Sequence, residues 1–506
     1  MKNSLSNFKN WIKSHPKESI FIFLILILAC FLRFYKLDQY MTFLGDEGRD
    51  ALMVERILVR HDFPLLGPPT SVGNMYLGPL YYYMMSLAML VFWLNPVAAA
   101  GMIATIGVLT IALIYFLTRK FFGVYAAVVA SVAYTISPVT IIYSRSSWNP
   151  NPESFFALLC LLGLYFLKQT NNFLWLILVG ASLAFALQMH YLALLLIPIL
   201  GIIFFYTIKI KNKKERHQNL YKGLIFSILI FFFLMSPLLI FDFKYNFLNL
   251  HAFLNIIHGQ NSPVQFNILA TLIRVFPIYQ YNLISRYLAG ENLIISLIFS
   301  ILIALPLIHA LRRKINHQPI SWPILTIAVW LILGILGLAF YRDSIYDHYL
   351  GFLNPVSFIL LGASINFFQK SFQFVAMIII LLILMLVNIP KNPLFTPPNN
   401  QLQRTQEIAK YVISESQNKP FNFALISGHN YDAAYQFYFE QYNHKPAVVP
   451  VEITDQLFVV CEDPVCKPIN NPKYEIAGFG LAKIADETSV LGVKVFKLVA
   501  NPGGKP

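Results

Sequence analysis

Long stretches without a charged residue recur along this 506-residue chain and limit what it can fold into. Several of them reach about 18 residues or more, the length at which an apolar segment is read as a helix crossing a bilayer. Only 12% of the residues are charged, and 57% are hydrophobic. This composition excludes a water-soluble core and predicts a multi-pass α-helical membrane protein.

The apolar runs give twelve candidate spans. They are 19–38, 77–95, 97–118, 121–143, 153–168, 172–189, 191–209, 220–241, 292–311, 320–341, 349–368 and 372–390. The first run is long, follows a basic segment and lacks a small-residue cleavage site. We therefore expect it to remain as a membrane anchor after a short cytoplasmic N-terminus, residues 1–18.

The basic residues test this set, because Lys and Arg concentrate in cytoplasmic loops. If run 77–95 stays at the outer surface, every basic cluster becomes cytoplasmic, including those at Arg119, Lys168, 209–216, 312–314 and Lys370. That run contains three consecutive tyrosines and is flanked by prolines, which suits an interfacial or re-entrant helix. About eleven spans then remain. The segments that face outward are residues 39–96, 242–291 and 391–506. The net charge of +14 then reflects the membrane topology of the loops and gives little reason to expect nucleic acid binding.

The last outward segment, 391–506, changes character after a linker rich in proline and asparagine. Helical patterns at 401–416 and 431–442 alternate with strand-like runs at 421–427, 456–461 and 493–499. We expect a small extracytoplasmic α/β domain following a membrane domain at 19–390. Cys461 and Cys466 lie in this domain and could form a disulfide in an oxidising compartment, a zinc site being less favoured with only one pair.

With this topology, polar residues from the outer ends of different spans gather on one side of the membrane. They are Asp46, Glu47, Arg49, Asp50, Tyr81, Tyr82, Tyr83, Arg145, Asn149, Glu153, His190, Tyr191, Asp242, Lys244, Arg342, Asp343, Asp347, His348 and Tyr349. Some of these residues also have a purely structural explanation. Tyrosines often form an interfacial belt, His190 could be a packing residue, and residues 341–349 could form a solvated hairpin. The adjacent carboxylates Asp46 and Glu47, close to a span end, favour function instead.

These motifs resemble the GT-C glycosyltransferases, specifically bacterial relatives of protein O-mannosyltransferases and of the aminoarabinose transferase that modifies lipid A. The resemblance covers residues 15–390. It rests on "GDEGRDA", "GPLYYYMMSLAMLVFW", "LTRKFFGVYAAVVASVAYTISPVTIIYSR", "LQMHYLALLLIPIL", "FDFKYNFLN" and "DHYLGFLNP", in that order. It implies the GT-C fold and a sugar donor linked to polyprenyl phosphate in the membrane.

By this resemblance, the sugar passes with inversion to an unidentified acceptor (protein, lipid or glycan) on the outer face of the cell membrane. Asp46 is expected to be the general base, with Glu47 beside it, because a hydroxyl nucleophile must lose its proton. Arg145 and Arg342 are the expected ligands of the leaving phosphate, since guanidinium binds phosphate bidentately. Some relatives use a divalent ion; Asp46 and Glu153 could hold one, although Asn149 stands where an acid might be expected.

Two other classes of function remain open. A transporter or flippase also has many spans, although it should place its charges near the membrane midplane. An envelope assembly protein or receptor would act through its C-terminal domain. Replacing Asp46 with Asn separates these alternatives, because only the transferase requires that carboxylate.

Overall fold

Each of the eleven runs predicted to cross the membrane contains an α-helix. The computed structural model describes residues 9–72, 74–209, 216–258, 264, 267–501 and 503. The first eight residues, and parts of 209–216 and 242–291, lie outside this range. The eleven helices are α2 (Pro16–Phe34), α6 (Pro96–Phe122), α7 (Val124–Ile136), α9 (Glu153–Thr170), α10 (Trp175–Met189), α11 (Leu196–Lys209), α12 (Arg216–Lys244), α15 (Leu293–Ile315), α16 (Trp322–Ala339), α17 (Asn354–Ala363) and α18 (Gln373–Asn388).

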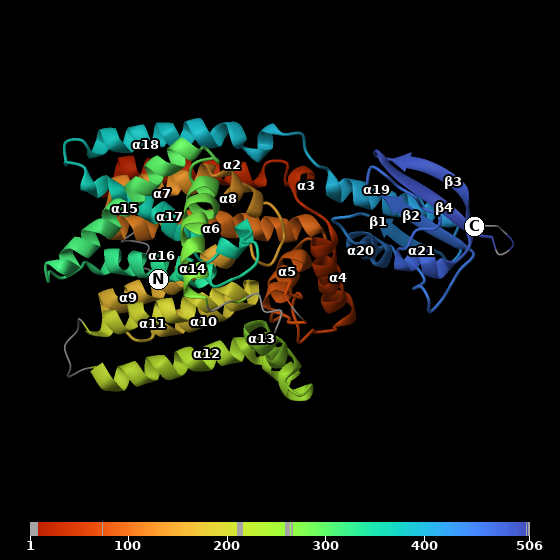
Figure 1. Cartoon of the computed structure of the whole chain (residues 1–506), viewed down its shortest axis with the longest axis horizontal. Helices are drawn as coiled ribbons and strands as arrows, with labels where there is room; N and C mark the ends of the chain where they lie inside the picture. Colours follow the sequence, from red (N-terminus) through yellow and green to blue (C-terminus); the bar gives the residue numbers. More distant parts are fainter. Residues whose placement is uncertain are drawn as a thin grey trace.

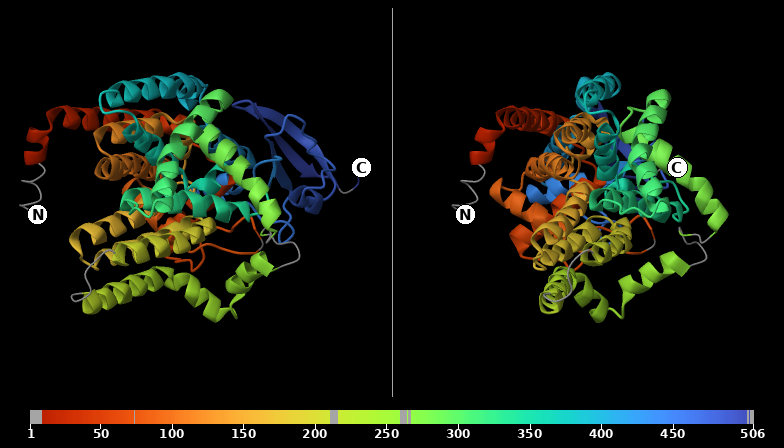
Figure 2. Two further views of the ribbon diagram at one scale, coloured as in Figure 1. Left: turned by 60° about the vertical axis from the view of Figure 1, so that its left-hand side comes forward. Right: turned by 90° about the vertical axis from the view of Figure 1, so that its left-hand side faces the viewer.

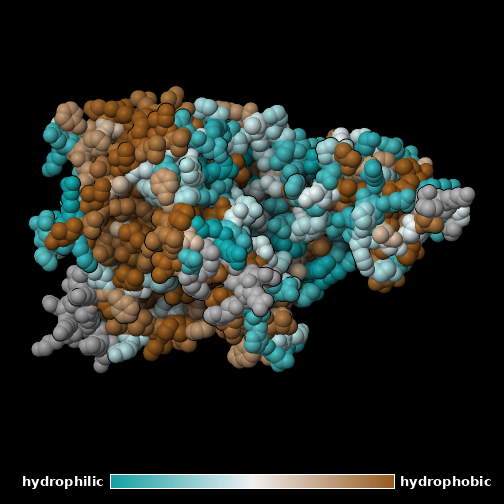
Figure 3. Space-filling view, in the orientation of Figure 1, coloured by the Kyte–Doolittle hydropathy of each residue, from teal (hydrophilic) through white to brown (hydrophobic). Residues whose placement is uncertain are grey.

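Six helical stretches in the described part of the chain are long and apolar enough to cross a bilayer. They are Pro96–Phe122, Tyr191–Ile208, Asn219–Lys244, Leu293–Ile315, Trp322–Ala339 and Gln373–Lys391. Further apolar helices in the bundle are shorter, so the number of eleven spans stays a prediction. The chain is a multi-pass α-helical membrane protein, and its bundle shows a broad apolar surface in Figure 3.

Shorter helices collect at the end of the bundle that carries the C-terminal domain, which we call the domain side (Figure 1). They include α3 (Leu37–Tyr40), α4 (Gly45–Arg60), α5 (Leu80–Val91), α8 (Pro138–Tyr143) and α13 (Leu248–His258). Helix α14 (Ile268–Pro277), which continues into the π-helix Ile278–Ser285, instead crosses the middle of the bundle in this view. Helix α5 occupies the run expected to stay at the surface. Its 12 residues would extend about 18 Å, short of the about 30 Å hydrocarbon core.

The C-terminal domain is a four-stranded sheet with helices packed against it. Strands β1 (Asn422–Ile426), β2 (Gln456–Cys461), β3 (Ala482–Val490) and β4 (Val493–Ala500) lie in the order β1-β2-β4-β3. Only the β1–β2 pair is parallel, with Ala424 opposite Val459. The helices are α19 (Gln401–Ser416), α20 (Ala433–Gln441) and α21 (Tyr474–Phe479). The left view of Figure 2 also places this sheet beyond the end of the bundle.

Most elements of this domain match the sequence expectation, whereas β3 and α21 do not appear in it. Strand β3 is largely exposed and polar, so it lacks the apolar alternation that marks a half-buried strand. The structure joins Cys461, at the end of β2, to Cys466 by a disulfide.

Helix α4 connects the two parts of the molecule by packing against α20, as Figure 1 shows. The contact is close because a Cβ atom at Gly48 would overlap the backbone of Ala434. Next to it, Arg56 and Arg60 of α4 form ion pairs with the buried carboxylate of Glu440 in α20. The C-terminal domain is therefore held against the helix that begins with the acidic motif.

Candidate active site

The first turn of α4 carries the acidic motif. Acidic side chains are favoured there because a helix N-terminus is partly positive. The Asp46 side chain is 42% exposed, and its Oδ1 accepts a hydrogen bond from Arg49 Nη1 at 2.9 Å. Nε and Nη2 of Arg49 both bind Asp50 Oδ1, at 2.9 and 2.8 Å. One guanidinium therefore connects an exposed carboxylate with a buried one.

Glu47 has a different environment from its neighbour. It is 7% exposed, and its Oε2 accepts a hydrogen bond from the backbone N–H of Leu44 at 3.0 Å, which caps the helix. Burial raises the pKa of Glu47 to about 7, and the nearby carboxylates Asp46 and Asp50 act in the same direction. The two adjacent carboxyl groups are thus suited to different tasks: Asp46 can meet a substrate, while Glu47 supports the start of the helix.

The C-terminal domain supplies a group that the sequence did not suggest. The hydroxyl of Tyr431, just before α20, donates to Asp46 Oδ1 at 2.8 Å, and Arg49 Nη1 lies 3.3 Å from the same hydroxyl. A further contact comes from Asn430, whose Oδ1 accepts a hydrogen bond from the backbone N–H of Gly45 at 2.8 Å. The loop before α20 therefore belongs to the immediate surroundings of Asp46.

A cavity of about 350 Å³ opens beside Asp46. Its lining combines the start of α4, the segment after α8 and the loop before α20, with Trp148 and Tyr431 among its aromatic residues. A smaller inner cavity adjoins it, and the two share Tyr143 and Asn151 in their walls. The two cavities are therefore direct neighbours.

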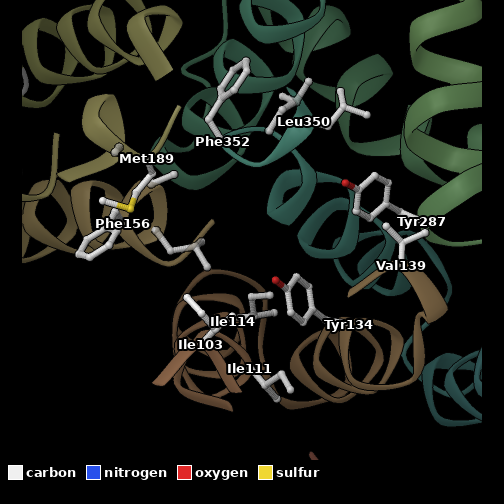
Figure 4. Close-up of a cluster of buried hydrophobic side chains, with 14 of the residues drawn as sticks. Ile103, Ile111, Ile114, Tyr134, Val139, Phe156, Met189, Tyr287, Leu350 and Phe352 are labelled. Atoms are coloured by element: carbon white, nitrogen blue, oxygen red, sulfur yellow. The ribbon is translucent and has the colours of Figure 1, made fainter. Parts of the chain in front are cut away.

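The inner cavity is polar although it lies among apolar side chains. Figure 4 shows the hydroxyl groups of Tyr134 and Tyr287 pointing toward the space between the helices, opposite residues such as Ile103 and Leu350. Asp347 and His348 also line this cavity. Burial lowers the pKa of His348 to about 4, against the opposing effect of the Asp46 carboxylate, so its ring is neutral near pH 7.

Four residues predicted from separate outer ends meet in one aromatic cluster. The ring of His190 lies 4.6 Å from Tyr191, 5.8 Å from His348 and 5.0 Å from Tyr349, measured between centroids. The His348 ring in turn lies 4.5 Å from that of Trp148, which lines the outer cavity. Aromatic surfaces of this kind pack well against the apolar faces of a bound ring.

Tyr81 and Tyr82 of α5 also lie at the site, with different partners. Tyr81 shares a hydrogen bond of 2.8 Å with Ser147, in the segment that lines the outer cavity. The Tyr82 hydroxyl lies beside Asp50 and Arg49. The tyrosines of this surface helix therefore contribute more than an interfacial belt.

An arginine absent from the sequence expectations, Arg286, stands next to Asp347. Its Nε lies 3.0 Å from Asp347 Oδ2, and its Nη1 contacts Glu291. Arg286 directly follows the π-helix, where the sequence shows no motif, so only the fold reveals the pairing. Through Asp347, which lines the inner cavity, Arg286 places a guanidinium next to that cavity.

Two predicted site residues instead have structural contacts. Arg145 is buried and donates to the carbonyls of Leu32 at 2.8 Å and Tyr35 at 2.7 Å, at the C-terminal end of α2. Asn149 donates to the carbonyl of Met189 at 2.7 Å, which caps α10. These contacts do not support the roles expected for the two residues, because both side chains satisfy helix ends that would otherwise be unpaired.

The remaining predicted residues lie apart from Asp46. Glu153 is fully buried at the start of α9, behind Gly351 in the wall of the inner cavity. Arg342 is exposed after α16, and its backbone carbonyl accepts a hydrogen bond from Arg274. No group of three or more His, Cys, Asp or Glu side chains in the described ranges is placed to hold a metal ion. The possible metal site of Asp46 and Glu153 thus gains no support from the geometry.

Fold and site together define a multi-pass membrane protein with a polar site at one end of its bundle, covered by a small α/β domain. Residues 77–241 match the family model described as dolichyl-phosphate-mannose-protein mannosyltransferase. A comparison with curated protein sequences finds no match.

Solved structures with the same fold have low sequence identity to the chain. ArnT from Cupriavidus metallidurans, bound to undecaprenyl phosphate, is 14% identical with a TM-score of 0.59, over 97% of this chain and 100% of that one. The archaeal oligosaccharyltransferase AglB from Archaeoglobus fulgidus, in complex with an inhibitory peptide and a dolichol-phosphate, is 15% identical. Its TM-score is 0.54, over 87% of this chain and 65% of that one. The chain therefore has the GT-C fold that its sequence motifs predict.

Proposed function

We propose that the protein is a membrane glycosyltransferase that moves a sugar from a polyprenyl-phosphate donor to an acceptor hydroxyl. The observation that carries this proposal is the half-exposed Asp46 carboxylate, oriented by Arg49 on the wall of a cavity at the domain side. A hydroxyl is a poor nucleophile until a base removes its proton. Of the two carboxyl groups that line the outer cavity, Asp46 is the exposed one, because Glu47 is buried and caps the helix.

The order of the groups along the two cavities suits an inverting displacement. The acceptor oxygen bonds to the anomeric carbon, its proton passes to Asp46, and the bond from that carbon to the phosphate oxygen breaks on the opposite face. The electron pair leaves with the lipid phosphate, whose charge needs a cation. Arg286, whose partner Asp347 lines the inner cavity, is a better placed candidate than Arg145, whose guanidinium is held by backbone carbonyls of α2 and the residues after it.

Other observations support a lipid-linked donor and an outward-facing site. Two proteins with the same fold were determined with undecaprenyl phosphate and with a dolichol-phosphate. The Cys461–Cys466 disulfide suits an oxidising compartment, as expected for a domain outside the cytoplasm. Both fit the orientation that the basic loops predict, with the site on the extracytoplasmic face of the cell membrane.

The test uses purified protein in lipid nanodiscs with a panel of polyprenyl-phosphate sugars and, separately, nucleotide sugars. Release of the lipid phosphate measures transfer. Asp46→Asn should reduce the rate by about 10²- to 10⁴-fold, the usual contribution of general acid–base catalysis. Glu407→Gln, on the exposed face of α19, should leave it unchanged.

Consumption of nucleotide sugars alone would refute the donor assignment. An Asp46→Asn protein that transfers sugar at the normal rate would refute the role of Asp46 as the base. A wild-type protein that transfers sugar from no donor would instead favour the transporter or receptor alternatives.

A further inference from the structure

We propose that Tyr431 positions the Asp46 carboxylate, so that the C-terminal domain completes the active site instead of only covering it. This inference rests on the proposed function. It concerns a residue of the C-terminal domain, which is separated from Asp46 by 385 positions in the sequence.

The hydrogen bonds of Asp46 are divided unequally between its two oxygens. Oδ1 accepts from the Tyr431 hydroxyl at 2.8 Å and from Arg49 Nη1 at 2.9 Å. Oδ2 has no hydrogen-bond partner within the described part of the chain. Two donors on one oxygen fix the plane of the carboxylate and leave the other oxygen available to accept a proton. An aspartate without them could rotate about its side-chain bonds and would lose part of this orientation.

Tyr431 is itself held firmly. Its ring lies directly over Gly45, where the Cβ atom of any other residue would overlap the ring. The preceding side chain, Asn430, joins the Gly45 N–H to Glu462, to which Nδ2 of Asn430 donates at 2.8 Å. Glu462 follows Cys461 of the disulfide and also accepts a hydrogen bond from the Tyr435 hydroxyl at 2.7 Å. The loop that carries Asn430 and Tyr431 is thus fixed both to the end of β2, through Glu462, and to the start of α4, through Gly45.

The docking of the whole domain supports the same conclusion. The carboxylate of Glu440 is 2% exposed and pairs with Arg56, Arg60 and Lys445. Phe43, just before α4, packs against Phe437 and Tyr438 of α20 at centroid distances of 6.1 and 5.9 Å. A domain attached in this way can hold the Tyr431 hydroxyl at a fixed position beside the Asp46 carboxylate.

The same loop forms one wall of the outer cavity, which is lined by His429, Asn430 and Tyr431. The opposite wall comes from the membrane domain, with Ile142 and Trp148. An acceptor that reaches Asp46 through this cavity therefore touches both parts of the protein.

The experiment compares Tyr431→Phe with a matched control, Tyr442→Phe. The first variant keeps the ring over Gly45 and removes only the hydroxyl. The control removes another hydroxyl of the same domain, which accepts a hydrogen bond from Gln406 at 2.8 Å. Tyr431→Phe should lower kcat by about 10- to 100-fold, the usual effect of losing a hydrogen bond to a charged group. The KM for the lipid-linked donor and the Tm should match those of Tyr442→Phe.

A second variant approaches the contact from the membrane domain. Gly45→Ala should displace the Tyr431 ring and lower kcat to a similar extent, and combining it with Tyr431→Phe should add little further loss.

The outcomes distinguish this inference from the proposed function. If the wild-type protein transfers sugar and Asp46→Asn does not, normal kcat in Tyr431→Phe would overturn the inference alone. A fall in kcat that is matched by a fall in Tm, relative to Tyr442→Phe, would also overturn it, since the role would then be structural. If the wild-type protein consumes no lipid-linked sugar, the proposed function itself fails.

Discussion

Asp46 and Glu47 are adjacent in the sequence but differ in what surrounds them. Both residues border the outer cavity, but the Asp46 side chain is 42% exposed, whereas Glu47 is 7% exposed and caps the helix that carries both. A pair of carboxyl groups in contrasting environments is a common way to separate an acid–base group from a supporting one. The contrast arises because successive residues of a helix point about 100° apart, so the two side chains cannot share one environment.

The buried carboxyl group should make stability depend on pH. Because burial raises the pKa of Glu47 from 4.5 to about 7, the folded protein retains a proton that the unfolded chain has released in this range. The free energy of unfolding should therefore fall as the pH rises from about 4.5 to about 7, by at most about 3 kcal/mol from this group. Glu47→Gln, which keeps a hydrogen-bond acceptor for Leu44, should remove this part of the dependence.

Thermal unfolding in nanodiscs at pH 5 and pH 8 measures the effect. The loss of Tm between the two values should be smaller in Glu47→Gln than in the wild type, while Glu407→Gln should behave as the wild type. Identical pH profiles for all three proteins would show that Glu47 is ionised in the folded state.

At this scale the sequence identified Asp46, Glu47 and Arg49 because they form a local motif. It could not predict the contacts of Arg145, since the carbonyls that this residue binds lie up to 113 positions away in the sequence. It also gave no sign of Tyr431 or Arg286, which acquire partners only when distant segments fold together. A single tyrosine or arginine carries no periodic sequence signal that would mark it as part of a site.

Helix α5 shows how one element serves two environments. One face buries Tyr81 and Tyr82 against the site, while the other exposes Leu87, Leu90 and Val91. Trp93, just beyond it, is 91% exposed, as suits a residue at a membrane interface. The helix therefore lies between the lipid and the site.

A charge on the outer face of α5 should disturb this arrangement. Leu87→Glu combined with Leu90→Glu should lower the Tm in nanodiscs and reduce transfer, because placing charges at lipid costs up to a few kcal/mol each. Leu87→Ala with Leu90→Ala is the control, since it removes apolar area without adding charge. Equal Tm values for the two double variants would indicate that this face meets water instead of lipid.

The elements themselves were largely predictable. The apolar runs correspond to helices, and the alternating patterns of the C-terminal domain correspond to α19, β1, β2 and β4. Hydrophobic burial imposes these patterns locally. The sequence did not predict strand β3, because the side chains of this strand are mostly solvated. It also does not determine the exact number of membrane crossings, because several helices of the bundle are shorter than the bilayer is thick.

The molecule as a whole consists of an apolar bundle with a hydrophilic domain at one end (Figure 3). The polar site lies where the two meet, and not at the middle of the bundle as expected for a transporter. This placement fits chemistry on a substrate delivered by the membrane to a water-accessible surface.

We predict that the C-terminal domain faces the outside of the cell membrane. Lys410→Cys, on the exposed face of α19, should react with a membrane-impermeant maleimide in intact cells. Lys370→Cys, exposed at the opposite end of the bundle between α17 and α18, should react only after permeabilisation. The reverse labelling pattern would place the site in the cytoplasm and would contradict the proposed donor.

The close approach at Gly45 and Gly48 has a consequence for protein engineering. A C-terminal domain grafted from a related protein would meet a surface shaped for one particular loop and helix, where α4 has no room for a residue larger than glycine at positions 45 and 48. Exchanging α4 together with residues 428–442 would preserve that fit. Chimeras intended to change the acceptor should therefore be cut around this composite unit, and not at the linker after α18.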